Sequence, residues 1–173
     1  MTTHATVDPN TLIRTYVHHH WVASRGGVEM FARAASGMPD PQVRAELAEL
    51  AEQVRQDRTV LREIADRVGV GQASLSQQLM VAGERLGRLK PNGSLTRRTA
   101  LTDLVELEAL VMAVRSKRQG WLAMLGFAER DDRFDEAELR RLIDRADEQV
   151  DRLDALHARA AAALPRYPGA MSS

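Results

Sequence analysis

Residues 40–69 read DPQVRAELAELAEQVRQDRTVLREIADRVG. The apolar residues of this stretch recur at alternating intervals of four and three, which is the period of one face of an α-helix. They are Val43, Leu47, Leu50, Val54, Leu61, Ile64 and Val68. Asp40 followed by Pro41 is typical of a helix start, and Gly69 is typical of a helix end. We therefore predict one long amphipathic helix here, with Asp57 as the only polar residue on its apolar face.

Similar signals divide the rest of the chain. Breakers occur at 37–41, 69–71, 90–93 and 131–134, and they separate long helical patterns at about 9–36, 41–69, 99–129 and 136–164. In the third of these patterns we assign the apolar face to Leu101, Leu104, Val111, Leu122 and Leu125. Each pattern is about 28 to 31 residues long, or roughly 42 to 46 Å, and matched lengths favour a bundle. A shorter pattern from Ser74 to Leu89 predicts a crossover helix.

The fold class expected from these patterns is all-α, an antiparallel four-helix bundle with an additional short crossover helix. Residues 1–8 are expected to form an N-terminal tail, residues 9–165 a single domain, and residues 166–173 a flexible C-terminal tail.

The composition argues against several classes of function. The chain has 24 Lys plus Arg against 24 Asp plus Glu, and it has no cysteine. Neutral charge argues against a general nucleic-acid or membrane-surface binder, and the missing cysteines exclude disulfides, thiol nucleophiles and cysteine-ligated metals. Without an apolar run of the ~18 to 20 residues that a bilayer requires, or a signal peptide at Met1, we expect a soluble cytoplasmic protein.

Polar residues on apolar helix faces are the main candidates for a site. His20 lies on the inward face of the first helix, level with Asp57 when the first hairpin is reflected about its loop. The two could share a charge-assisted hydrogen bond. A similar reflection of the last hairpin places Glu108 beside Asp154 and His157.

Carboxylates and histidines from several helices are the ligands of di-iron and di-manganese sites, which use Glu-x-x-His motifs. Asp154 and His157 form a shortened version, and Glu108 could bridge. Helix 41–69 has Val60 three residues after Asp57, so the second half of the motif is missing. We favour a buried polar cluster of His20, Asp57, Glu108, Asp154 and His157, with Fe or Mn binding as the alternative.

A third interpretation concerns residues 62–80, whose spacing of Ala65, Gly69, Leu75 and Leu79 is that of a helix-turn-helix DNA-binding motif. Residues 69–98 are also basic, with five Arg or Lys against one Glu. The recognition helix would however contain neither Arg nor Lys, and we therefore do not favour nucleic acid as a partner.

The chain also resembles a group of uncharacterised actinobacterial helical-bundle proteins with a ferritin-like fold. The resemblance covers about residues 10–164. It rests on Tyr16 with His19 or His20, Gly26–Gly27–Val28–Glu29, Asp57, residues 82–89 with Asn92–Gly93, and Glu106–Leu107–Glu108. It implies a ferritin-like topology and carries no known activity. We therefore predict a non-enzymatic structural or interaction protein without an intact di-iron site, with a homo-oligomer or a protein partner formed through leftover apolar surface.

Overall fold

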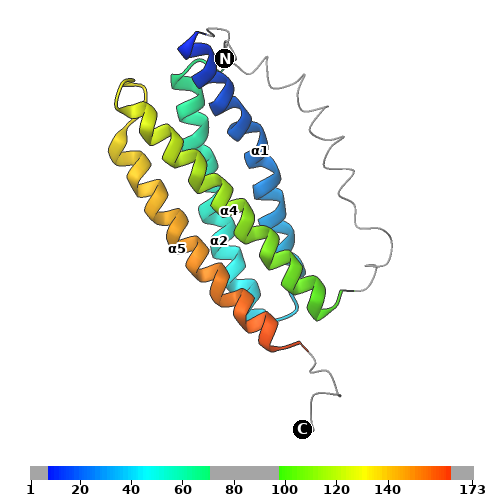
Figure 1. Ribbon diagram of the computed structural model, residues 1–173. Helices are drawn as coiled ribbons and strands as arrows, with labels where there is room; N and C mark the ends of the chain where they lie inside the picture. Colours follow the sequence, from blue (N-terminus) through cyan, green and yellow to red (C-terminus); the bar gives the residue numbers. More distant parts are fainter. Residues whose placement is uncertain (1–7, 71–97, 165–173) are drawn as a thin grey trace, which may run out of the picture.

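The computed structural model describes residues 8–70 and 98–164. Within these ranges the chain forms four helices: α1 (Pro9–Gly37), α2 (Pro41–Arg67), α4 (Ala100–Ala128) and α5 (Glu136–Ala162). Figure 1 shows them side by side, with α1 antiparallel to α2 and α4 antiparallel to α5. The all-α class and the antiparallel pairing are confirmed. All four helices begin and end within two residues of the predicted limits.

Aspartates set three of the helix starts, as the sequence predicts. The side chain of Asp8 accepts a hydrogen bond from the Thr11 amide at 3.0 Å, and Asp40 accepts one from the Gln42 amide at 2.8 Å. Asp135 accepts from the Glu138 amide at 2.9 Å. Such caps satisfy backbone donors that have no partner inside the helix.

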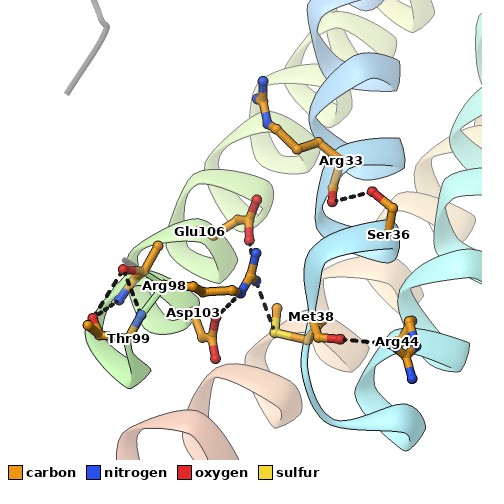
Figure 2. Close-up of polar contacts among 9 residues, drawn as sticks. Arg33, Ser36, Met38, Arg44, Arg98, Thr99, Asp103 and Glu106 are labelled. Carbon is orange, nitrogen blue, oxygen red and sulfur yellow. Dashed lines mark hydrogen bonds and ion pairs between the residues drawn. The ribbon is translucent and has the colours of Figure 1, made fainter. Parts of the chain in front are cut away.

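Two hairpins make up the bundle. The α1–α2 and α4–α5 pairs pack together along their lengths, while α1 meets α4 and α2 meets α5 over smaller regions. At one end of the bundle, Arg98 fastens the start of α4 to the α1–α2 loop. Its guanidinium donates to Asp103 at 2.6 Å, to Glu106 at 2.7 Å and to the Met38 sulfur at 3.4 Å (Figure 2). Arg98 also lies so close to Gly37 that a β-carbon there would be 2.5 Å from its Nη1 atom.

The last residues of α2 lie at the opposite end of the bundle. Arg14 of α1 donates to the Gly69 carbonyl at 2.5 Å, and Gly69 ends the helix with a positive φ of 77°. The end of α2 and the start of α4 therefore lie at opposite ends of α1. The predicted crossover helix falls in 71–97, and the predicted tails fall mostly in 1–7 and 165–173, outside the described residues.

The core confirms the predicted face of α2 completely: every apolar residue of its stripe is buried, and so is Asp57. The predicted face of α4 is only partly right, since Val111 is buried and Leu125 packs against the core. Leu101 is 55% exposed and Leu122 is 36% exposed, while the buried side chains are Leu107, Leu110, Val111, Val114, Trp121 and Met124. Because α4 is apolar on several sides, periodicity alone does not select the face that packs inward.

Among the residues that the structure describes, no helix combines the length and the apolar character that crossing a membrane requires.

Candidate functional site: a buried ion cluster beside an open groove

Asp57 is the centre of a polar cluster in the middle of the bundle. It is 2% exposed, and its carboxylate contacts Lys117 of α4 and Arg145 of α5. Gln149 of α5 completes the cluster: its carbonyl oxygen accepts from Lys117 at 2.5 Å, and its amide nitrogen donates to Gln53 of α2 at 3.0 Å. One carboxylate thus joins three helices.

The cluster is electrostatically unusual because two cations share one carboxylate in a largely buried place. Burial lowers the pKa of Lys117 and outweighs the opposing effect of Asp57, which is the next largest influence. A buried charge is tolerated only when it is paired, so removing the single anion would leave two cations exposed to this penalty. The Lys117 ammonium is already engaged by Asp57 and Gln149, so its role here is to hold helices together.

A groove of about 1120 Å³ lies next to this cluster and opens to solvent. Residues of α1, α2 and α4 line it. The facing helices α2 and α5 are instead joined by ion pairs: Arg152 contacts Glu46 at 2.7 Å and Glu49 at 2.9 Å. Polar contacts thus join α2 to α5, while α1 and α4 approach each other closely at Gly120 and line the groove together with α2.

The groove has apolar walls with a few basic groups. Val22, Phe31, Val54, Leu61, Val114 and Met124 are among its apolar lining residues. Its charged lining residues are Arg14, Asp57, Arg58 and Lys117, and Asp57 is already neutralised by its own partners. Apolar walls with a few placed polar groups are typical of sites for small organic ligands.

His20 lies at the close approach of α1 and α4. A β-carbon on Gly120 would be 2.8 Å from the imidazole, so glycine is what allows the ring to fit there. The ring of Tyr16 also packs against His20, tilted by 56° with the two ring centroids 4.8 Å apart. The hydrogen bond expected between His20 and Asp57 is not formed, because Lys117, Arg145 and Gln149 occupy the carboxylate instead.

We expect His20 to make folding stability depend on pH. Burial, and then the neighbouring His19, lower the pKa of His20 below its ordinary 6.5. As pH falls through 6.5, the unfolded chain takes up the proton before the folded chain does, so stability falls. Urea unfolding between pH 7.5 and pH 5 should show this loss, and His20→Gln should reduce the slope. An unchanged slope in His20→Gln would contradict the assignment.

The other predicted residues gather on a different part of the surface. His157 Nε2 and Glu108 Oε1 are 3.2 Å apart, which confirms that α4 and α5 bring these two together. Asp154 pairs with Arg115 at 3.2 Å and is half exposed. Of the five candidates, only Glu108 and His157 contact each other, while His20, Asp57 and Asp154 each have other partners.

Among residues 8–70 and 98–164, no three histidine or carboxylate side chains come together closely enough to hold a metal ion. The helix-turn-helix interpretation falls partly outside these ranges: Ile64 to Val70 form the end of α2 and its cap, and residues 71–80 are not described.

Several residues of the site were not predicted from the sequence. Whether these side chains point inward depends on the rotation of each helix, which the sequence pattern did not specify. They are Lys117, Arg145, Gln149, Arg58 and Trp121. One signal was present: Lys117 is one of only two lysines beside 22 arginines, and it lies three and four residues from Val114 and Trp121 on the same face of α4. If the inward face of α4 had been assigned from Trp121, Lys117 would have been predicted to point into the bundle.

Comparison with known proteins gives no family. No protein-family model matches the chain, and neither curated proteins nor solved structures provide a significant match.

Proposed function

We propose that this chain is a non-enzymatic binding protein, a helical bundle that holds an amphipathic molecule in the groove formed by α1, α2 and α4. The observation that carries the proposal is the groove itself, about 1120 Å³ of open space with apolar walls and basic groups. Gly27, which lines it, would meet no atom within 4 Å if it carried a β-carbon. Space of this kind beside a packed core fits a ligand.

The polar centre of the bundle supports a role without catalysis. In carboxylate-bridged metal proteins, the inward carboxylates are free to bind metal. Here Asp57 is held by Lys117 and Arg145, whose positive charges oppose a second cation at the same carboxylate. Two antiparallel helical hairpins packed side by side also occur in ferritin-like folds. We propose a ferritin-like ancestry in which an ion cluster has replaced the metal centre.

One observation favours metal binding as a second candidate. The Glu108–His157 contact offers an imidazole and a carboxylate on neighbouring helices, with Asp154 one turn before His157. Binding of Fe or Mn there would require Asp154 to release Arg115.

A contact with a second copy or a protein partner fits another surface. Leu101, Val105 and Met112 of α4 are each more than half exposed, and α4 carries them along its outer side. Sedimentation of the wild type against Val105→Lys should show a larger species that the substitution removes.

The experiment that tests groove binding uses two matched glycine variants. Gly27 and Gly126 are both helical, and a β-carbon at either would meet nothing within 4 Å, but only Gly27 lines the groove. Gly27→Leu and Gly126→Leu should each raise the free energy of unfolding by about 0.5 to 1 kcal/mol, because glycine is a poor helix former. Only Gly27→Leu fills the groove.

Melting temperatures are then measured with dodecanoate, dodecanol, dodecylammonium, Fe²⁺ and Mn²⁺. A ligand that binds the folded state raises the melting temperature. We expect an amphipathic ligand to stabilise the wild type and Gly126→Leu but not Gly27→Leu. Stabilisation by none of the three organic ligands, or by the same amount in both variants, would overturn the proposal. Stabilisation by a metal alone, lost in His157→Ala, would favour the second candidate.

A further inference from the structure

Arg58 is a half-buried cation on the groove wall whose charge is not balanced. Its guanidinium carbon lies 4.0 Å from the centre of the Trp21 ring. Within the described part of the chain it forms no ion pair, and its buried Nε atom has no hydrogen-bond partner. Neighbouring Arg25 and Arg62 each have one, Glu29 at 2.8 Å and Asp66 at 3.8 Å.

The pKa of Arg58 is lowered, first by burial and then by the nearby charges of Arg25 and Arg62. Each of these effects would be relieved by an anion beside the guanidinium.

Two further buried nitrogens on the groove wall also have no hydrogen-bond partner among the described residues: Nε1 of Trp121 and Nε2 of His18. Trp121 is 2% exposed, and an indole N–H can only donate. Buried polar nitrogens without a partner are rare in folded proteins, and a ligand or a water beside them is one explanation.

These three groups come from three helices but lie at similar depths along the bundle. The contact of His20 with Gly120 aligns α1 with α4, and Trp121 directly follows Gly120. Asp57 contacts Lys117, one turn before Trp121 on α4, and Arg58 directly follows Asp57. His18, Arg58 and Trp121 therefore line the groove at one level of the bundle, and Arg58 also lies over Trp21 of α1.

An apolar channel leads away from this point. From His18 to Phe31, α1 advances thirteen residues, or about 20 Å. Its lining residues there include Val22, Gly27 and Met30, faced by Val54 of α2 and Val114 of α4. An acyl chain is about 15 Å long, half the hydrocarbon thickness of a bilayer, so the channel has room for one.

We propose that the groove binds a free single-chain fatty acid, with its carboxylate at Arg58, Trp121 and His18 and its acyl chain along the channel toward Phe31. This inference rests on the proposed function and adds the charge and shape of the ligand. Charge complementarity supports it, because Asp57 is the only carboxylate among the described lining residues and is already paired. The guanidinium offers a charge-assisted hydrogen bond, which is stronger than a neutral one.

Tryptophan fluorescence provides the readout, since Trp21 and Trp121 are the only tryptophans in the chain. Full-length protein is titrated at pH 8 with dodecanoate, dodecanol and dodecylammonium, all below their micelle concentrations. Dodecanoate should give a saturable change, and the neutral and cationic ligands should bind at least about tenfold more weakly, the loss expected for a missing charged hydrogen bond.

Two arginine variants of α2 separate a direct contact from a general charge effect. Arg58→Gln should weaken dodecanoate at least about tenfold without changing dodecanol. Arg55→Gln, which removes an exposed arginine paired with Glu52, should change neither ligand. Gly27→Leu should weaken all binding, because it fills the channel.

The outcomes distinguish the two proposals. Equal binding of all three ligands, or equal losses of dodecanoate and dodecanol in Arg58→Gln, would overturn the fatty-acid inference and leave groove binding in place. Binding of none of them to the wild type would overturn both. Retained melting temperatures of the variants show that they are folded.

Discussion

Replacing Asp57 by alanine should lower the free energy of unfolding by about 3 to 5 kcal/mol, the usual cost of leaving buried charges without their partner. Lys117 and Arg145 would then be two cations at the centre of the bundle with no carboxylate between them. Gln149 offers Lys117 only a neutral oxygen. Urea denaturation followed by circular dichroism measures the change.

The Asp57→Leu/Lys117→Met double variant tests whether the loss comes from unpaired charge. Removing both partners leaves Arg145, which is partly exposed and can reach water. We expect the double variant to be less destabilised than the sum of its single changes. Glu52→Ala, which breaks an exposed pair with Arg55, should cost less than about 1 kcal/mol. An Asp57→Ala loss no larger than that of Glu52→Ala would contradict the arrangement of the cluster.

Leu110→Ala should also cost about 2 to 5 kcal/mol, because it removes a fully buried side chain from the core. Leu101→Ala should change the free energy of unfolding by no more than about 0.5 kcal/mol, since Leu101 is more than half exposed. Both residues are leucines of α4, so the substitution and the helix are matched.

The Leu110→Ala and Leu101→Ala variants together test which face of α4 packs inward. The sequence pattern assigns Leu101 to the core, and the structure assigns Leu110 to it. Equal losses in the two variants, measured by the same urea denaturation, would mean that α4 is rotated relative to the structure described here.

The difference between α2 and α4 shows how much of the fold can be predicted from sequence. Polar residues surround the apolar stripe of α2, so only one face can be buried, and Val43 to Val68 are all placed correctly. In α4, apolar residues occur on most sides, and the choice between faces depends on where α1 and α5 lie. Caps and breakers depend on local chemistry, which explains why the helix ends were predictable.

The candidate site was predictable only in part. Asp57 stands out as a carboxylate on an apolar stripe, and hairpin reflection correctly brings Glu108 to His157. The same reflection gives the level of His20 but not its direction, and the ring packs toward Gly120 and Tyr16. The partners of Asp57 come from the other hairpin, whose position relative to α2 no local pattern specifies. The groove could not be predicted either, because it too depends on how the two hairpins are placed relative to each other.

If the groove lined by α1, α2 and α4 is the binding site of this protein, a ligand should perturb its lining residues. Amide chemical shifts of the ¹⁵N-labelled protein, followed during titration with dodecanoate, test this most directly. We predict that the largest shifts occur at residues 14–31 of α1, 54–61 of α2 and 113–124 of α4, with little change at the exposed residues of α5. Largest shifts on α5, or no saturable shift at all, would contradict the claim.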